Sequence, residues 1–170
     1  RSLFFRNTAA AESFKWGSLQ FGVESTYDRN AGSTLSAGEK EMLDVAVFAS
    51  AELNISNRLS VRPGVRYGYN SLYKTQPAPA VNVKYDMDRT MQLRFGYGRG
   101  FRVPSLRELF HEFIDANHNI LGNPALTPEY SHNVNTDFSK TFEKLNLNTS
   151  ISAFYNHIND RITFFTPAQS

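Results

Sequence analysis

Cysteine is absent from the chain, so neither a disulfide framework nor a thiolate metal site can form within it. Long apolar runs are missing too, because no stretch approaches the roughly 20 apolar residues of a transmembrane helix. Neither sign of charge is in large excess, since the net charge is +2 with 20% charged residues. This balance supplies no clustered basic face, so we expect no nucleic-acid partner.

Aromatic residues are plentiful by contrast. They make up 14% of the chain, with 14 Phe and 8 Tyr, yet the mean hydropathy is polar at −0.42. A chain rich in Phe and Tyr but polar on average fits β-strands that have one apolar face and one polar face.

The strongest pattern is the alternation of apolar and polar residues with a period of two, which is typical of half-buried strands. In residues 59–69 the apolar positions carry Leu, Val, Pro and Tyr, whereas the polar positions carry Ser, Arg and Gly. The pattern recurs clearly at residues 79–85, 91–98 and 145–156, and more loosely at 18–27, 44–53 and 131–138. We therefore expect about seven strands, each close to the 9–11 residues that a tilted strand needs to cross a bilayer.

The polar positions of these strands favour a water-filled lumen, because they hold mainly Arg, Asn, Gln, Ser and Gly. Tyrosines gather near strand ends, as in the aromatic girdles of membrane barrels; these are Tyr27, Tyr67, Tyr69, Tyr85, Tyr97 and Tyr155. The expected connections alternate in length, with long or medium loops at 27–44, 70–76 and 101–129 and short turns at 54–57, 86–89 and 142–144. This rhythm is that of outer-membrane barrels.

The predicted fold is all-β: an antiparallel meander of about seven or eight long strands, part of a transmembrane β-barrel, with one short helix in a long outside loop. We expect residues 1–170 to be one partial barrel domain, because seven strands leave two edges that lipid does not tolerate. The chain also opens at Arg1 and shows no signal peptide, so we expect it to be an internal piece of a longer protein. Two other interpretations stay open: a small self-contained outer-membrane barrel with a structural or adhesive role, and a soluble β-sandwich or lipocalin-like binding module.

A glycine-rich stretch at 96–129 carries the most specific motifs. Ser105 followed by Glu108 is a capping box, and it predicts a short helix with Leu106, Leu109, Phe110 and Phe113 on its apolar face. The motif residues of this stretch are Phe101, Arg102, Pro104, Ser105, Glu108, Leu109, Gly122, Asn123, Pro124, Leu126, Pro128 and Glu129. With these residues the chain resembles the C-terminal half of the β-barrel in TonB-dependent outer-membrane receptors, the family that imports siderophores, cobalamin and haem.

The resemblance implies a function in nutrient uptake. Members of this family hold a plug domain inside a barrel of about 22 strands, and TonB pulls on a segment before the plug. Nothing in this chain matches the plug, so it would contribute barrel wall, lumen lining and outside loops. The resemblance implies the bacterial outer membrane as location. The expected partners are its lipid bilayer, the TonB complex through the plug, and a small nutrient such as a ferric siderophore, cobalamin or haem.

Candidate ligand-binding residues are few. His111 and His118 lie between the two motifs, where some haem-binding members carry a histidine, and imidazole is a good iron ligand. Arg62, Arg66, Arg94 and Arg102 could attract an anionic ligand, although arginines of a lumen would more often pair with acidic plug residues. Helix packing on the barrel rim and a lid over a ligand are equally compatible with the predicted helix.

An enzyme is not expected. The glycines at 96, 98 and 100 lack the spacing of a dinucleotide-binding loop. His111 and His118 are seven residues apart with loop between them, and Glu108 and Glu112 fit a solvated helix face. We predict no catalytic residue, no resident metal and no cofactor.

Overall fold

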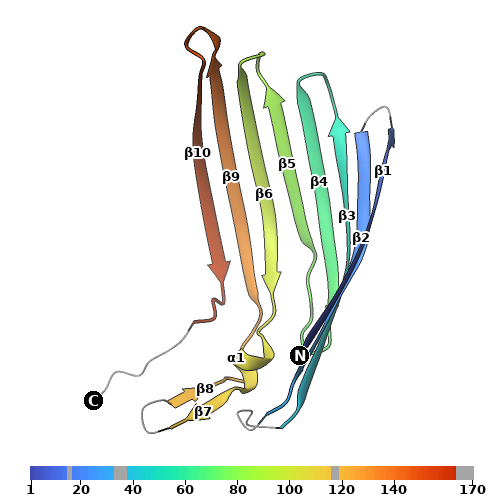
Figure 1. The fold of residues 1–170 in the computed structure, drawn as a ribbon, viewed down its shortest axis with the longest axis vertical. Helices are drawn as coiled ribbons and strands as arrows, with labels where there is room; N and C mark the ends of the chain where they lie inside the picture. The colour runs from blue at the N-terminus through green and yellow to red at the C-terminus, as the bar shows by residue number, and fades with distance from the viewer. Residues whose placement is uncertain (15–16, 33–37, 116–118, 164–170) are drawn as a thin grey trace, which may run out of the picture.

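One antiparallel sheet of eight long strands dominates the computed structural model, which describes residues 1–14, 17–32, 38–115 and 119–163. Each strand of the sheet lies beside the one that precedes it (Figure 1). They are β1 (Ser2–Phe14), β2 (Gly17–Asn30), β3 (Lys40–Asn54), β4 (Leu59–Asn70), β5 (Ala78–Asp86), β6 (Met91–Arg102), β9 (Glu129–Phe142) and β10 (Leu147–Asn159). The predicted antiparallel meander of about seven or eight long strands is confirmed.

Strand β1 was not among the strands located from the alternation. Its pattern is weak, because Phe4 stands among the polar positions and Asn7 among the apolar ones. Pairing with β2 nevertheless places Arg6 opposite Glu24, and a register shift between Ala11 and Phe14 marks the end of the regular ladder. Pairing with β2 therefore determines the position of β1, although the alternation in its own sequence is weak.

Tight turns and longer loops lie at opposite ends of the sheet (Figure 1). The β3–β4 and β5–β6 connections are tight turns, and the 3-10 helix η1 (Glu143–Leu145) with left-handed Asn146 joins β9 to β10. The connections at 31–39, 71–77 and 103–128 lie at the other end. The first is shorter than predicted, since β2 continues to Asn30 and β3 starts at Lys40.

The register of the sheet keeps two kinds of row on opposite faces. On one face Val47 is paired with Val23 of β2 and with Tyr67 of β4. On the other face Glu24 is paired with Ala46 in the adjacent row. Because side chains alternate between faces along a strand, most apolar positions of the strands lie on the first surface, although Phe4, Phe48 and Phe154 lie on the other. We call this surface the outward face and the other one the polar face.

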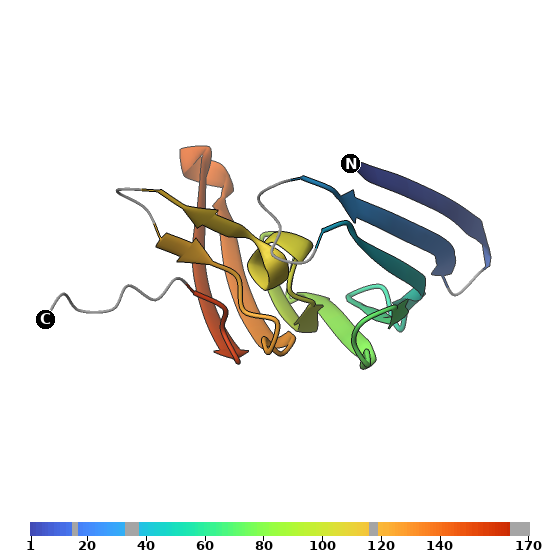
Figure 2. The same ribbon diagram turned by 90° about the horizontal axis from the view of Figure 1, so that it is seen from below.

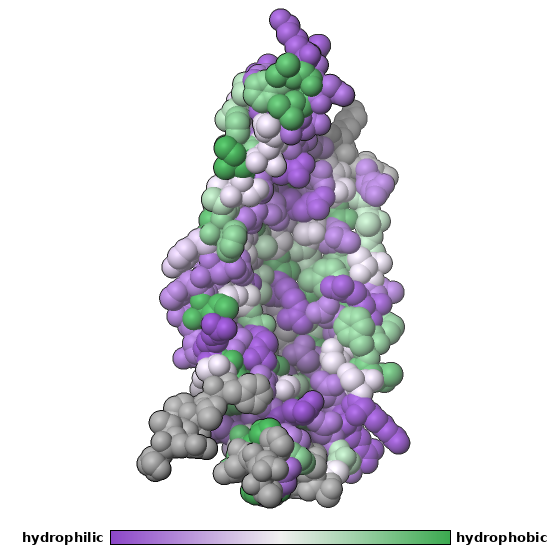
Figure 3. Space-filling model, turned by 60° about the vertical axis from the view of Figure 1, so that its left-hand side comes forward, coloured by the Kyte–Doolittle hydropathy of each residue, from purple (hydrophilic) through white to green (hydrophobic). Residues whose placement is uncertain are grey.

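The outward face does not form a core. Val47 is 54% exposed and Ile151 74% exposed. Among the described residues the buried apolar side chains include Met42, Ala46, Pro104, Leu106 and Leu109, and none of them belongs to the outward face. A soluble sandwich would pack such rows against each other, and in the described residues no second sheet covers them. Hydrophilic residues are frequent in the hollow along the middle of the surface in Figure 3.

The sheet forms a curved wall, and helix α1 (Leu106–Phe110) lies within its curve (Figure 2). The capping box is present, with Ser105 Oγ accepting from the Glu108 N–H and the Glu108 carboxylate accepting from the Ser105 N–H. The helix is shorter than predicted. Phe113 is not on its apolar face but belongs to β7 (Glu112–Ile114), which pairs with β8 (Asn119–Leu121).

The helix ends early because the chain turns extended at His111, whose φ and ψ are −70° and 133°. Glu112 therefore leaves the helix as well, and the predicted Glu108–Glu112 helix face does not exist. In the described part of the chain, no helix has the length and apolar character needed to cross a membrane.

Candidate functional site

An ion-pair ladder crosses the polar face near the loop end of the sheet. Arg66 donates from Nε to Oε1 of Glu24 at 2.7 Å and lies 3.4 Å from Oδ1 of Asp44. Arg6 approaches the same Glu24 at 3.1 Å, and Asn70 Nδ2 donates to Asp44 at 3.3 Å. Four adjacent strands are thus joined by charged side chains.

Small residues make room for this ladder. Glu24, Ala46 and Gly68 are aligned across β2, β3 and β4, and Ala46 is only 1% exposed. A Cβ at Gly68 would lie 3.6 Å from Nη1 of Arg66. The guanidinium therefore lies over a row of small side chains, where surrounding carboxylates hold it in place.

The other predicted wall arginines also have partners on the wall. Arg62 forms an ion pair with Glu52. Arg94 donates from Nε to Gln92 at 2.7 Å, and Gln92 in turn donates to Asp86 at 2.7 Å. Both lie closer to the tight-turn end than Arg66, so the structure does not bring Arg62 and Arg94 into one site with Arg102.

Arg102 joins four segments at the rim. Its guanidinium makes two parallel hydrogen bonds to Glu129, at 2.8 and 3.0 Å, and further bonds of 3.0–3.1 Å to Glu108. Glu129 also accepts from the backbone N–H of Ile162 at 2.6 Å. Bidentate pairs of this kind fix geometry as well as charge. Arg102 therefore ties the end of β6, helix α1, the start of β9 and the segment after β10 into one latch.

Glu108 holds its charge in this latch. Burial by itself raises the pKa of Glu108, but the guanidinium of Arg102 and the N–H and hydroxyl of Ser105 stabilise the carboxylate. Its pKa is therefore lower than the ordinary glutamate value. An ionised Glu108 accepts from the helix N-cap and from Arg102 at the same time, so the capping box and the latch share one residue.

The second motif docks the returning chain against α1. The N–H of Gly122 donates to the carbonyl of His111 at 2.6 Å, and the N–H of Asn123 donates to the backbone carbonyl of Glu108 at 2.9 Å. The side chain of Asn123 then accepts from the N–H of Ala125 at 2.9 Å. A Cβ at Gly122 would lie 2.7 Å from the backbone of Leu109. Only glycine allows this approach, so the second motif holds the returning chain against helix α1.

A cavity of about 400 Å³ lies between the ladder and the latch. Its lining includes Asp44, Arg66 and Arg102 from the polar face, and Arg99, which the register assigns to the outward face. The cavity forms where β5 begins at Ala78, so that Gly100–Val103 pass without a strand beside them on that side. Nε of Arg99 is buried with no hydrogen-bond partner in the described residues, and a water or anion oxygen in the cavity would satisfy it.

Loop 71–77 lies beside the cavity at the loop end of the sheet. The hydroxyl of Tyr73 donates to the carbonyl of Leu126 at 3.0 Å, and burial raises the pKa of Tyr73. Gln76 accepts from Arg99. The loop therefore bridges β4 to the docked chain that carries the second motif.

The two histidines do not form a site together. His111 ends helix α1, its N–H donating to the carbonyl of Arg107 at 3.0 Å, and its ring stacks on Phe113 at 6.5 Å. It does not line the cavity. His118 lies outside the described residues. In the described part of the chain, no three His, Asp or Glu residues are grouped as metal ligands would be.

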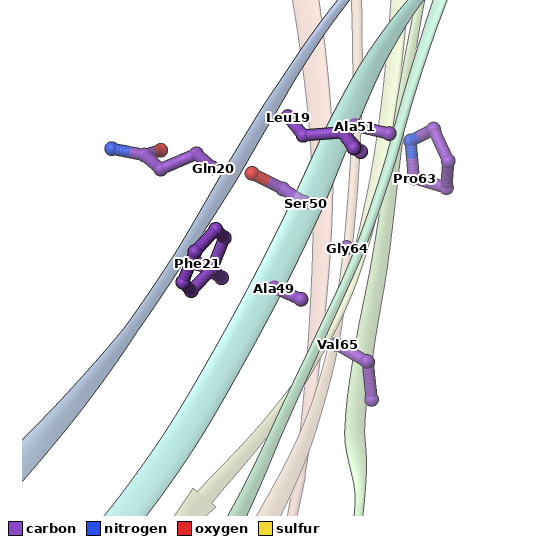
Figure 4. A pocket seen from close by; sticks show the side chains of 9 residues that line it. All are labelled: Leu19, Gln20, Phe21, Ala49, Ser50, Ala51, Pro63, Gly64 and Val65. Atoms are coloured by element: carbon purple, nitrogen blue, oxygen red, sulfur yellow. The ribbon is translucent and has the colours of Figure 1, made fainter. Parts of the chain in front are cut away.

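A second, shallower depression of about 510 Å³ lies on the outward face (Figure 4). Ala49 and Ala51 form its floor between Leu19 and Pro63, while Gln20 points to the opposite side of β2. Pro63 has no N–H to donate, and the β3–β4 ladder is interrupted beside it. An apolar depression on this face would contact lipid hydrocarbon, and it lacks the charged groups that would bind a polar nutrient.

Glu24, Asp44 and Arg99 were not among the predicted site residues. Glu24 and Asp44 lie in the two loosely alternating segments, where a single carboxylate at a polar position signals little. Arg99 had a stronger signal, because it interrupts an otherwise apolar row of β6. Only the cross-strand register shows which of these charged groups face one another.

The sequence matches the family described as TonB dependent receptor-like, beta-barrel, over residues 3–170. The chain therefore belongs to the TonB-dependent receptors, as part of the β-barrel, and its place is the outer membrane. It is 28% identical over 152 residues to the iron-regulated outer membrane virulence protein of Vibrio cholerae serotype O1, covering 85% of this chain and 23% of the relative. The chain thus spans about a quarter of the length of that curated relative.

Solved structures show the same fold. The siderophore receptor PirA from Pseudomonas aeruginosa superposes with a TM-score of 0.78 at 16% identity, covering 91% of this chain and 31% of that one. The ferric enterobactin receptor PfeA from Pseudomonas aeruginosa, in a G324V form, gives 0.75 at 15% identity, covering 92% and 26%. The copper transporter OprC gives 0.70 at 14% identity, covering 92% and 30%. At 14–16% identity this likeness shows the fold of the chain.

Proposed function

We propose that the full-length protein takes up a ferric siderophore across the outer membrane, with this chain forming part of the barrel wall and of the ligand-facing loops. The observation that carries the proposal is the arginine-lined cavity between the ladder and the latch. It opens at the loop end of the polar face, where an incoming ligand would first meet the wall.

The cavity presents guanidinium groups that are already oriented, and Arg99 among them bonds Gln76 and has no carboxylate partner in the described residues, so its positive charge is the one left for an anion. Arg66 and Arg102 are each held by two carboxylates, so little side-chain freedom remains to be lost when an anion binds. Several of the relatives are described as iron-regulated or as siderophore receptors, which favours a ferric siderophore over cobalamin. The identity of that siderophore is left to experiment.

TonB would be the energising partner, acting through a plug domain elsewhere in the protein. Arg62 and Arg94 lie deeper on the polar face and would meet the plug. Their partners on the wall leave hydrogen-bonding capacity for such contacts, since a guanidinium carries five N–H donors.

The test is uptake of ⁵⁵Fe-labelled ferric enterobactin by cells that lack their own siderophore receptors and express the full-length protein. We expect uptake that disappears when TonB is deleted. Arg66→Gln should reduce uptake about tenfold or more, because a charge-assisted contact is worth roughly 1.5–3 kcal/mol. Arg89→Gln, which removes an exposed arginine of the β5–β6 turn, should change it little.

Equal effects of Arg66→Gln and Arg89→Gln, with both variants correctly folded, would remove the cavity as the ligand contact. Haemin and cupric ions serve as competing ligands in the same cells. Haem-dependent growth that is lost in His111→Ala or His118→Ala would replace the siderophore by haem. Copper accumulation without iron uptake would replace it by a copper ligand.

A further inference from the structure

A basic row interrupts the outward face at its loop end. Arg99 of β6 is paired with His132 of β9, and His132 is paired with His157 of β10. The three strands lie side by side in Figure 1. In β6 every other outward position is apolar or aromatic, so Arg99 departs from the pattern of its strand, whereas the outward positions of β9 and β10 also include Thr136, Lys140, Thr149 and Asn159.

Aromatic residues flank this basic row on both sides. Tyr97 and Tyr155 lie in the row nearer the tight-turn end, whereas Phe101 and Tyr130 lie in the row nearer the loops. Aromatic girdles of membrane barrels sit at the level of the lipid headgroups. The basic row therefore lies at the depth where the membrane carries its charged groups.

The basic side chains are held in position. The guanidinium of Arg99 lies 5.4 Å above the ring of Tyr130, a cation–π geometry. The hydroxyl of Tyr97 is 2.9 Å from Nδ1 of His132, and the two rings stack at 6.1 Å. Nε2 of His132 has no hydrogen-bond partner in the described part of the chain and remains available to a ligand.

No carboxylate neutralises the row. The outward positions of β6, β9 and β10, all fully described, contain neither Asp nor Glu. The polar face differs, because Arg62, Arg66 and Arg102 each pair with acidic residues of the wall. The outward positions of these strands therefore offer no carboxylate that would compete with an anion for the row on the side that faces lipid.

We propose that Arg99, His132 and His157 form a binding site for the phosphate group of a lipid in the outer leaflet of the membrane. The acyl chains of that lipid would lie along the apolar rows below, beside Val134 and Tyr155. The inference rests on the outer-membrane location and not on the transported ligand. Arg99 also lines the cavity, whereas His132 and His157 do not, so variants of the two histidines separate lipid binding from uptake.

The test uses the full-length receptor in detergent, titrated with lipid A and with dephosphorylated lipid A and read by native mass spectrometry. We expect the phosphorylated lipid to bind about tenfold more tightly, as one or two charge-assisted hydrogen bonds would give. The triple variant Arg99→Gln, His132→Gln, His157→Gln should lose this preference. Arg94→Gln removes a positive charge from the same strand on the polar face and should keep it.

Heat-dependent gel mobility checks that each variant is folded. If the triple variant does not fold, His157→Gln alone, whose side chain is exposed, should still weaken binding of the phosphorylated lipid, and Arg99→Lys should retain it. Equal binding of both lipids by the native receptor would overturn the proposal, as would an equal loss in Arg94→Gln. Displacement of the lipid by millimolar inorganic phosphate would also overturn it, because the site would then serve a soluble anion.

Discussion

Gly122 shows how a single backbone position holds the large loop in place. Gly122→Ala would put a Cβ 2.7 Å from the backbone of Leu109 and Phe110, so the docked chain would have to move away from α1. We expect faster proteolysis of residues 103–128 in the full-length receptor. Gly98→Ala is the matched control, since its Cβ would come no closer than 4.0 Å to Ala80. Equal protease resistance of the Gly122 variant would contradict the docking role.

Arg102 cannot be replaced by another cation if the latch works through geometry. Lysine keeps the charge but not the planar fork that bonds two carboxylates at once. Arg102→Lys should therefore increase amide hydrogen exchange in α1 and at the start of β9 several-fold. Arg107→Lys, on the exposed side of the same helix, should not. A variant with native exchange rates would show that charge alone suffices.

Acid should open the same latch through Glu108. The pKa of Glu108 in the folded protein lies below its ordinary value, which is about 4.3. Its contribution to stability is therefore complete above that ordinary value and is lost as the pH falls below it. Hydrogen exchange in α1, corrected for the intrinsic pH dependence, should rise as the pH falls below that ordinary value. Glu108→Gln should weaken this dependence, and an unchanged profile would contradict the assignment.

Strands were the most predictable elements because their signal is local. Alternation in residues 59–69 and 91–98 needs only the period of the pleat, and the resulting faces are those of β4 and β6. The start of α1 was equally readable, since Ser105 and Glu108 carry the capping box themselves. Its end was not, because the extended backbone of His111 is fixed by the docking of Gly122, eleven residues further along the chain.

The candidate site was less predictable than the strands. Arg66 and Arg102 were identified as candidates, but their partners Glu24, Asp44 and Glu129 come from three other strands. A sequence shows the face of each charge and not the register that brings charges together. Strand β1 was missed for a different reason, because its own alternation is weak.

The two faces of β3 should respond in opposite ways to charge. Val47→Lys places an ammonium group on the outward face, where a charge near the bilayer midplane costs roughly 2–4 kcal/mol. Ser50→Lys places it on the polar face and should cost far less. The check is the free energy of unfolding of the full-length receptor in lipid vesicles. Similar losses for both variants would mean that Val47 does not face hydrocarbon.

The whole wall needs further strands to close. In the described sheet β1 and β10 each have one neighbour, and a sheet edge in lipid leaves backbone groups without partners. We predict that amides of β1 and β10 in the full-length receptor exchange as slowly as those of β4. In residues 1–170 alone they should exchange much faster. Fast exchange of both edge strands in the full-length protein would contradict closure through additional strands.

The separation of tight turns from long connections also decides what an antibody can reach. Outer-membrane barrels keep short turns on the periplasmic side and long loops outside. A peptide tag inserted at 71–77 would be displayed to immunoglobulins on living bacteria, whereas the same tag in the β5–β6 turn would stay hidden until the cells are permeabilised. Immune selection would therefore act on only one end of this wall.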